Sequence, residues 1–234
     1  MSLLTLDAMR TDIGQYAVLH DVGFDVPEGG VFVLLGRNGA GKTTTLRSIM
    51  GLWKPSPGSV RFRGRDLTGM HTADIARLGI AYVPESMGIF GTLTVDENLV
   101  LAADRGRLDP ARLKRIHTLF PALERFRDKQ AWSLSGGQKQ MLSVARAIIE
   151  PRALILVDEP TKGLAPSIVD AMAEAFREIA QDATILLVEQ NFDFARSLGT
   201  DVAVIDDGRV VHRGRMADFA ADAALQDRLL SLSA

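Results

Sequence analysis

The stretch VFVLLGRNGAGKTTTLRSI, residues 31–49, contains the features that decide the fold of this 234-residue chain. It begins with five apolar residues, continues as a glycine-rich loop and ends in residues that are compatible with a helix. An uninterrupted apolar run that ends in glycine is typical of a strand buried on both faces. The stretch therefore predicts a strand, a loop and a helix in that order, with the loop at the carboxyl end of a buried strand.

The loop matches a phosphate-binding pattern, because residues 36–43, GRNGAGKT, fit G-x-x-x-x-G-K-[ST]. Glycines let the backbone curve around an anion, and the N–H groups at the start of the following helix point toward it. In this pattern the lysine reaches the β- and γ-phosphates, and the Thr43 hydroxyl is a ligand of Mg²⁺. The bland alternative is a glycine turn with a solvated lysine, but the strand before it and the helix after it favour a nucleotide site. The predicted nucleotide-binding residues are Gly36, Arg37, Asn38, Gly39, Ala40, Gly41, Lys42, Thr43 and Thr44.

Strand and helix signals alternate along the rest of the chain. Short apolar runs at 80–85, 153–159 and 183–190 resemble the run before the loop, which predicts a parallel α/β core. Half-polar runs separated by glycine turns flank the loop and predict an antiparallel β-lobe. Between the strands at 80–85 and 153–159 the apolar residues have helical spacing, so we expect a helical subdomain at about 88–150 inserted into the core. We predict that residues 1–234 form one such domain.

Three elements are predicted after residue 160. Residues 167–182 have the pattern of an amphipathic helix, and residues 202–214 read as a hairpin that turns at Asp207-Gly208. Residues 216–232 are expected to form one closing helix.

The composition narrows the classes of partner. With 27 basic and 29 acidic residues the formal net charge is −2, so there is no general electrostatic attraction for nucleic acid, and we expect none as a partner. The chain has no cysteine, which excludes disulfides and thiol chemistry. Its longest apolar runs, such as VFVLL and ALILV, are far shorter than the roughly 18 to 20 residues that span a bilayer.

An acidic pair, Asp158 and Glu159, lies at the carboxyl end of the apolar run ALILVDE. Ligands of open α/β sheets bind at this end of the strands. We predict that Asp158 holds Mg²⁺ through its water shell and that Glu159 orients and deprotonates the attacking water. The alternative is a solvated strand end or a helix N-cap, which the nearby phosphate loop makes less favourable.

The segment LSGGQKQMLSVARAII, residues 134–149, resembles the signature of ATP-binding cassettes. Here a serine and two glycines open a helix without a preceding strand or a phosphate-loop lysine, so the segment has the features of half a binding site. The resemblance implies that two cassettes face each other head to tail and that the signature of one closes over the γ-phosphate held by the other. The residues that it adds to the nucleotide site are Ser135, Gly136, Gly137 and Gln138.

Departures from the common cassette pattern identify a subfamily. Glu85 stands where glutamine is usual, Gln190 replaces the switch histidine, and Ala165 replaces the aspartate that normally crosses the dimer interface. With DEPTKGLAP and LLVEQN, these residues are similar to the LivF-type ATPase subunits of branched-chain amino-acid importers. The resemblance implies a catalytic role for Glu85 and Gln190 and a Mg²⁺ ligand in Glu85. Singly, Glu85 could be a surface carboxylate and Gln190 a strand terminus.

The aromatic residue that stacks on adenine in this family is displaced here. Ile13 occupies the expected position, and Tyr16 lies shortly after it. We therefore predict that Tyr16 stacks on adenine; the alternative is that it packs beside a strand.

The resemblance implies an ATPase that uses ATP and Mg²⁺ to drive solute import. Its implied partners are membrane permease subunits, a second cassette that is paralogous or identical, and, through the complex, a substrate-binding protein. The implied location is the cytoplasmic face of the inner or plasma membrane, as a peripheral subunit. Branched-chain amino acids are the predicted solutes, and the alternatives are a urea or amide importer or a cassette ATPase outside transport.

Overall fold

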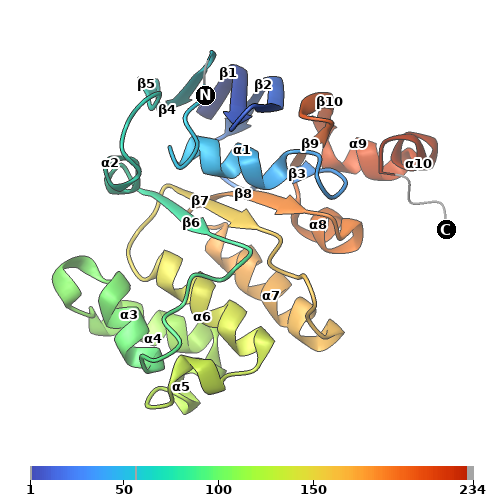
Figure 1. The fold of residues 1–234 in the computed structure, drawn as a ribbon. Coiled ribbons are helices and arrows are strands. Elements are labelled where there is room, and N and C mark those ends of the chain that lie inside the picture. The colour runs from blue at the N-terminus through green and yellow to red at the C-terminus, as the bar shows by residue number, and fades with distance from the viewer. Residues whose placement is uncertain (1, 56, 231–234) are drawn as a thin grey trace.

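The computed structural model describes residues 2–55 and 57–230, which form two β-sheets and surrounding helices (Figure 1). The larger sheet has six strands in the order β10-β9-β3-β8-β7-β6, and all neighbours are parallel except β10, which runs antiparallel to β9. Its strands are β3 (Val31–Leu35), β6 (Ile80–Val83), β7 (Leu154–Asp158), β8 (Thr184–Glu189), β9 (Asp201–Asp206) and β10 (Arg209–Arg215). The predicted parallel α/β core is confirmed.

Both faces of this sheet are covered, as the continuous apolar runs indicate. Along β3, Val31, Val33 and Leu35 belong to one hydrophobic cluster, and Phe32 and Leu34 belong to another. Alternate side chains of a strand point to opposite faces, so the two clusters mark the two sides of the sheet. The helices that cover the sheet include α1 (Lys42–Ile49), α2 (Thr72–Arg77), α7 (Pro166–Ile179) and α8 (Phe192–Leu198).

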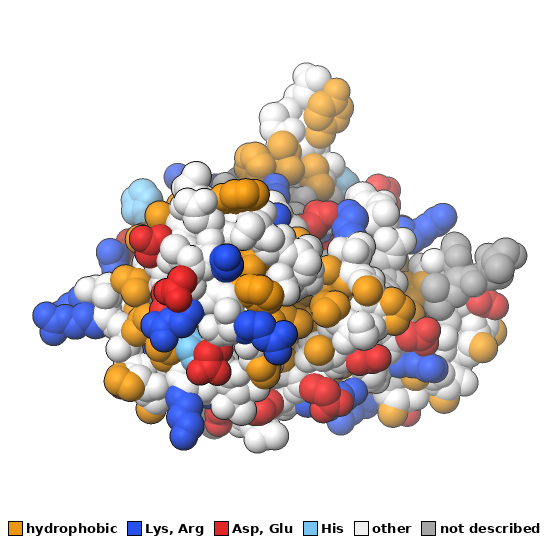
Figure 2. Space-filling view, turned by 90° about the horizontal axis from the view of Figure 1, so that it is seen from below, with side chains coloured by type: hydrophobic (Ala, Val, Ile, Leu, Met, Phe, Trp, Pro, Cys, Tyr) orange, Lys and Arg blue, Asp and Glu red, His pale blue; other side chains and the backbone are white. Residues whose placement is uncertain are grey.

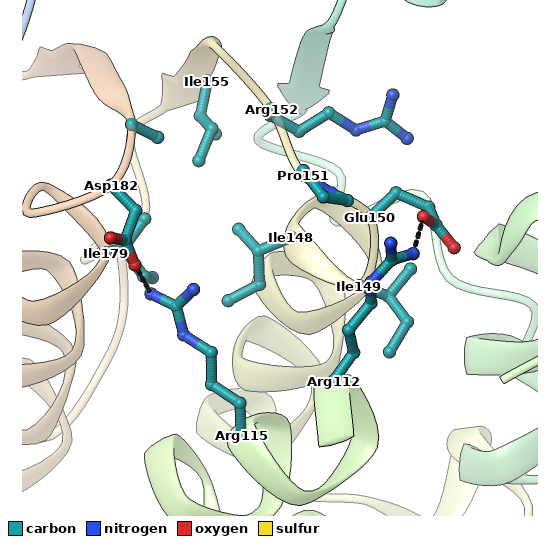
Figure 3. Close-up of a pocket in the computed structure, with 11 residues that line it drawn as sticks. Arg112, Arg115, Ile148, Ile149, Glu150, Pro151, Arg152, Ile155, Ile179 and Asp182 are labelled. Carbon is teal, nitrogen blue, oxygen red and sulfur yellow. Dashed lines mark hydrogen bonds and ion pairs between the residues drawn. The ribbon is translucent and has the colours of Figure 1, made fainter. Parts of the chain in front are cut away.

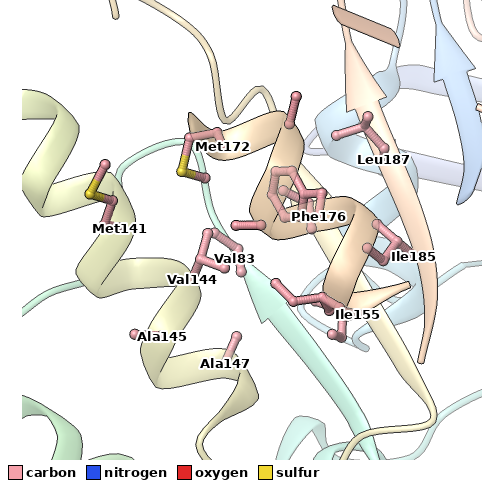
Figure 4. Packing of buried hydrophobic residues seen from close by; sticks show 14 of the residues in the cluster. Val83, Met141, Val144, Ala145, Ala147, Ile155, Met172, Phe176, Ile185 and Leu187 are labelled. Carbon is pink, nitrogen blue, oxygen red and sulfur yellow. The ribbon is translucent and has the colours of Figure 1, made fainter. Parts of the chain in front are cut away.

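Figure 4 shows how one side of the sheet is packed. Phe176 of α7 lies beside Ile155 of β7 and Ile185 of β8, and Met172 of the same helix lies on the side of α6; all four side chains are almost fully buried. Burial of a large apolar side chain contributes about 1.5 to 3 kcal/mol relative to exposure. This packing fixes the strand ends from which the loops of the site extend.

The smaller sheet is the predicted antiparallel β-lobe, with the strand order β2-β1-β4-β5. Its strands are β1 (Ser2–Ile13), β2 (Tyr16–Pro27), β4 (Ser59–Phe62) and β5 (Arg65–Asp66). The strand β1 was not predicted, because shifts of register between Leu6 and Met9 and the left-handed backbone of Ala8 interrupt its alternation. Its residues Leu3, Leu4, Leu6 and Met9 are nevertheless buried.

Between β6 and β7 the described chain is helical. Its helices are α3 (Val95–Ala102), η1 (Asp104–Gly106), α4 (Pro110–Leu119), α5 (Pro121–Arg125), η2 (Ala131–Ser133) and α6 (Gly136–Ile148). Thr94 with Glu97 and Ser135 with Gln138 form capping boxes that begin α3 and α6. The fold is thus the predicted α/β class with an antiparallel β-lobe and a helical subdomain.

The elements after β8 agree with the sequence in part. The hairpin of β9 and β10 turns at Asp207-Gly208, and both residues have positive φ, as this short turn requires. The prediction of a single closing helix is wrong within the described residues, which form two helices, α9 (Met216–Ala221) and α10 (Ala223–Leu230). Asp222 separates them because its backbone leaves the helical region and its carboxylate accepts a hydrogen bond from Leu225 N. The predicted residues 231–232 lie outside the described chain.

In residues 2–55 and 57–230, the helices are all too short or too polar to span a bilayer.

Candidate active site

The glycine-rich loop joins β3 to α1 and has the backbone that its glycines allow. Gly39 and Gly41 have φ of 82° and 107°, a region that other residues rarely adopt. At Gly36 a Cβ atom would lie 2.3 Å from the carbonyl oxygen of Ile205, so this position has no room for a side chain. The turn of the β9–β10 hairpin also supports the loop, since Gly208 N donates to Ala40 O at 2.9 Å.

Lys42 begins α1 and is buried, with 4% of its surface exposed. Its ammonium donates to the backbone oxygens of Gly36 at 2.8 Å and Arg37 at 3.0 Å. Glu159 Oε1 lies 3.1 Å from the same nitrogen. The loop therefore curls around a cation at the end of a helix, with backbone N–H groups nearby, and this is a favourable arrangement for phosphate.

The two oxygens of Asp158, at the end of β7, each accept a hydrogen bond from a hydroxyl group. Thr43 Oγ1 donates at 3.0 Å and Tyr82 Oη donates at 3.1 Å. Burial raises the pKa of Asp158, and the hydrogen bonds from Thr43 and Tyr82 oppose that rise. Burial also raises the pKa of Tyr82, which keeps its hydroxyl protonated as a donor.

The hydroxyl of Thr43 and the carboxylate of Asp158 form a set of hard oxygen donors that fits Mg²⁺. Within the described ranges, no three acidic or histidine side chains converge as a complete metal site. Mg²⁺ commonly binds through one or two carboxylates together with substrate phosphates and water, so a complete protein cage is not required. The pair is thus suited to a Mg²⁺ that arrives with a nucleotide.

Glu159 lies between two lysines. Its backbone has a positive φ of 45°, and its N–H donates to Val188 O at 2.9 Å, which holds the turn against β8. Lys42 Nζ faces one carboxylate oxygen, and Lys162 Nζ lies 3.7 Å from the other. Lys162 also contacts Glu85 Oε1 at 2.5 Å. Strained backbone of this kind persists only where the surrounding structure holds it.

Several of these groups line one pocket of about 440 Å³. The pocket combines the phosphate loop, the start of α1 and the residues after β6 and β7. It is lined by Asn38, Gly39, Gly41, Lys42, Thr43, Thr44, Arg47, Glu85, Glu159 and Lys162. Residues predicted from three separate parts of the sequence, the phosphate loop, Glu85 and Glu159, are therefore brought together.

Three other groups of predicted residues do not line this pocket in the described chain. Ser135 is exposed, and its hydroxyl accepts from Gln138 N at 3.3 Å to cap α6. Gln190 is exposed at the end of β8, and Tyr16 is 69% exposed at the start of β2. Their roles in the nucleotide site remain predictions.

The sequence interpretation missed Lys162 and Arg47, which line the pocket. It also missed the buried hydrogen bonds around Glu189, which we call the brace behind the pocket. Glu189, which is 2% exposed, accepts hydrogen bonds from the N–H and hydroxyl of Thr161 and from two backbone N–H groups at the end of β8. Burial raises the pKa of Glu189, although these four donors lower it. The sequence signal that could have identified Glu189 is its charge at the end of an otherwise apolar run.

The fold and the pocket define a nucleotide-binding protein of the phosphate-loop class, and comparison with known proteins gives its family. Residues 19–162 match the ABC transporter family. The chain is 35% identical over 231 residues to the high-affinity branched-chain amino acid transport ATP-binding protein BraG of Pseudomonas aeruginosa, covering 97% of this chain and 99% of the relative. It is 35% identical over 202 residues to the probable branched-chain amino acid transport ATP-binding protein LivF of Archaeoglobus fulgidus, covering 84% and 85%.

Solved structures agree with this assignment. An ATP-binding subunit of an ABC transporter is 30% identical with a TM-score of 0.83, and the match covers 98% of this chain and 97% of that one. A nucleotide-free cassette from an ABC transporter has a TM-score of 0.80 at 23% identity, with 96% and 97% covered, and supports the fold alone. The chain belongs to the ABC transporter family, in which it is an ATPase cassette.

Proposed function

We propose that this ATPase powers an importer of branched-chain amino acids. The observation that carries the proposal is the match to BraG, which extends over nearly the full length of both chains. The LivF relative has the same transport function in its name. Glu85, Ala165 and Gln190, the departures from the common cassette pattern, support the same subfamily.

In this proposal Glu159 is the general base of hydrolysis. Its carboxylate is 10% exposed and lies at the pocket wall beside Lys42, where it can orient a water molecule and accept its proton. Lys42 binds phosphate oxygens in place of its present partners, since bonds to charged phosphate oxygens are stronger than its bonds to the neutral carbonyl oxygens of Gly36 and Arg37. Gln190 is proposed to donate a hydrogen bond near the γ-phosphate, and it cannot carry the charge of a histidine.

Thr43 and Asp158 are the proposed Mg²⁺ ligands. Glu85, the other predicted ligand, pairs with Lys162, and we propose that it stays in that pair. When bound, Mg²⁺ neutralises charge on the phosphates. Tyr82 and Thr43 fix both oxygens of Asp158, so this carboxylate is oriented before any ligand enters.

A second cassette is proposed to complete the site. Ser135–Gln138 begin α6 with exposed groups at its N-terminus, outside the pocket of the same chain. An opposing phosphate loop would give these N–H groups an anion. Ala165 lacks the carboxylate that usually crosses the interface, so we propose a paralogous partner that retains it. Tyr16 is proposed to stack on adenine with its exposed ring.

The helical subdomain and Glu85 are the proposed permease-docking region. A groove of about 410 Å³ lies between the end of β6 and α6. Phe90, Leu101 and Trp132 are exposed in this part of the chain, and Arg146 lies over the ring of Phe90 at 5.0 Å. Viewed from below Figure 1, hydrophobic side chains lie in small groups among charges of both signs (Figure 2). Permeases would hold the cassette at the cytoplasmic face of the membrane, and a substrate-binding protein would deliver the solute.

The test is co-expression with the neighbouring cassette and permease genes, followed by pull-down and uptake of labelled leucine in proteoliposomes. We expect a heterodimeric cassette pair on two permeases and ATP-dependent leucine uptake. Assembly with permeases only as a homodimer would reject the paralogous partner.

The same vesicles distinguish the solutes. Labelled methionine is included because a methionine import ATP-binding protein of Burkholderia pseudomallei is 34% identical over 88% of this chain. If methionine, urea or another amide were taken up while leucine, isoleucine and valine were not, the proposal of branched-chain amino acids as substrates would be rejected. The proposal that the protein powers an importer would stand. Failure of every solute, with no permease recovered, would reject the transport function.

A further inference from the structure

Lys162 is one of three cations that line the nucleotide pocket, together with Lys42 and Arg47. It lies three residues after Glu159, and its Nζ reaches Glu85 Oε1 at 2.5 Å and Glu159 Oε2 at 3.7 Å. Glu85 comes from the segment after β6 and Glu159 from the segment after β7, so one ammonium group links two strand ends. Glu85 also raises the pKa of Lys162, chiefly by accepting its hydrogen bond, which keeps the lysine charged.

The backbone directs Lys162 toward the pocket. The preceding residue, Thr161, turns inward and donates both its N–H and its hydroxyl to the buried Glu189. Lys162 N donates to Glu159 O at 3.3 Å, which closes a tight turn. With Thr161 fixed inward, the side chain of Lys162 lines the pocket and is 57% exposed to it and to solvent.

The charges of the pocket explain why a cation is needed beside Glu85 and Glu159. Glu85 and Glu159 are carboxyl groups that line the pocket, Asp158 lies near both of them, and phosphate is itself anionic. Lys42 is the cation at the loop, but its contact with Glu159 competes with phosphate for the same ammonium. When Lys42 turns to phosphate, Lys162 is the lysine still beside Glu159, and it already faces Glu85.

We propose that Lys162 is the counter-ion that lets a terminal phosphate approach Glu85 and Glu159, so that the cassette favours nucleoside triphosphates over diphosphates. The inference rests on nucleotide binding at the phosphate loop. Lys162 acts as a positioning residue, because it holds the two carboxylates and neutralises their repulsion of the γ-phosphate. A diphosphate, which lacks that group, gains little from it.

The test is calorimetric titration of the full chain with Mg²⁺ and either ADP or the non-hydrolysable analogue AMP-PNP. Lys162→Gln should weaken AMP-PNP binding about tenfold and ADP binding less than about twofold, since like charges then oppose only the triphosphate. Lys162→Arg should restore most of the affinity. Lys54→Gln, the same change at an exposed lysine outside the pocket, should leave both affinities unchanged.

A double variant separates a counter-ion from a direct phosphate ligand. Lys162→Gln with Glu85→Gln should regain much of the AMP-PNP affinity, because the uncompensated carboxylate is gone. Equal loss for both nucleotides, no loss for either, or no recovery in the double variant would overturn the proposal. A wild-type chain that bound neither nucleotide would instead reject nucleotide binding, on which the proposal rests.

Discussion

The nucleotide pocket and a cleft beside α4 both contain paired charges, and they differ in what lies beneath the charges. The nucleotide pocket, of about 440 Å³, has a glycine loop and a helix N-terminus as its floor. A second cleft of about 120 Å³ lies between α4 and the segments around β7 and α7 (Figure 3). There Arg112 pairs with Glu150 and Arg115 with Asp182, above a floor that includes Ile148 and Ile155.

The comparison shows that arginines and carboxylates alone do not make an anion site. In the cleft each of these two guanidinium groups has a carboxylate partner, and the floor is made of isoleucine side chains. In the pocket, Lys42 takes backbone carbonyls and Glu159 as partners, and the N–H groups that begin α1 converge on the same space. Phosphate can replace the partners of Lys42 and also satisfy those N–H groups. The cleft pairs join helix α4 to the core, and we assign them to structure.

The largest effect expected from this difference is on hydrolysis. Glu159→Gln should lower turnover by about 10² or more while ATP binding is retained, because the amide keeps the shape but cannot accept a proton. ATPase assays and nucleotide titration measure the two quantities. The variant should also accumulate an ATP-bound closed dimer, detectable by size-exclusion chromatography. A loss of turnover below about tenfold would show that Glu159 is not the principal base.

The next effect is on binding, and it compares the two hollows directly. Lys42→Ala should weaken ATP binding by about tenfold or more and lower turnover with it, since a charge-assisted contact is lost. The matched control in the cleft is Arg115→Ala, which removes a cation 42% exposed and should leave ATP affinity unchanged. Titration with a fluorescent ATP analogue provides both values. Equal losses in the two variants would break the distinction between pocket and cleft.

The smallest effect concerns the brace behind the pocket. Thr161→Val removes the hydroxyl that donates to Glu189 at 2.7 Å and should lower the free energy of unfolding by about 1 to 2 kcal/mol at pH 7. Burial raises the pKa of Glu189 in the folded state. The neutral carboxyl group therefore stabilises the fold at pH values below 4.5, its ordinary pKa, and this stability is lost as the pH rises through the folded-state pKa.

The hydroxyl opposes this rise in pKa, so its removal should cost more at pH 7 than near pH 4. Urea unfolding at the two pH values measures the difference. The control is Thr118→Val, an exposed helical threonine, whose effect should stay within about 0.5 kcal/mol. The same loss at both pH values would contradict the role given to Glu189.

The sequence predicts the parts of this site that are local. The phosphate loop and the pair Asp158-Glu159 are each contiguous motifs at strand ends, and the topology of a parallel sheet brings such ends together. The partners of Lys162 lie 77 and 3 residues away, so only the structure shows the link to Glu85. Glu189 belongs to an apolar run, and its four donors come from a separate loop and from the turn after β8.

The same distinction holds for the fold. The strands of the core have continuous apolar runs that identify them, whereas β1 is irregular because bulges break its alternation. The break between α9 and α10 depends on the capping carboxylate of Asp222, which a helical hydrophobic pattern does not reveal.

The turn at Asp207-Gly208 has a consequence for protein engineering. Hairpin turns usually tolerate inserted residues and are convenient places for epitope tags or fluorescent labels. Here Gly208 donates to Ala40 O in the phosphate loop and accepts from His20 N of the β-lobe at 2.7 Å. Its Cα is also close enough to Val18 that an added Cβ would lie 2.2 Å from that residue's carbonyl oxygen. A tag placed here would distort the nucleotide loop, whereas the open turn at Gly64, where a Cβ would meet no atom within 4 Å, is the better place for one.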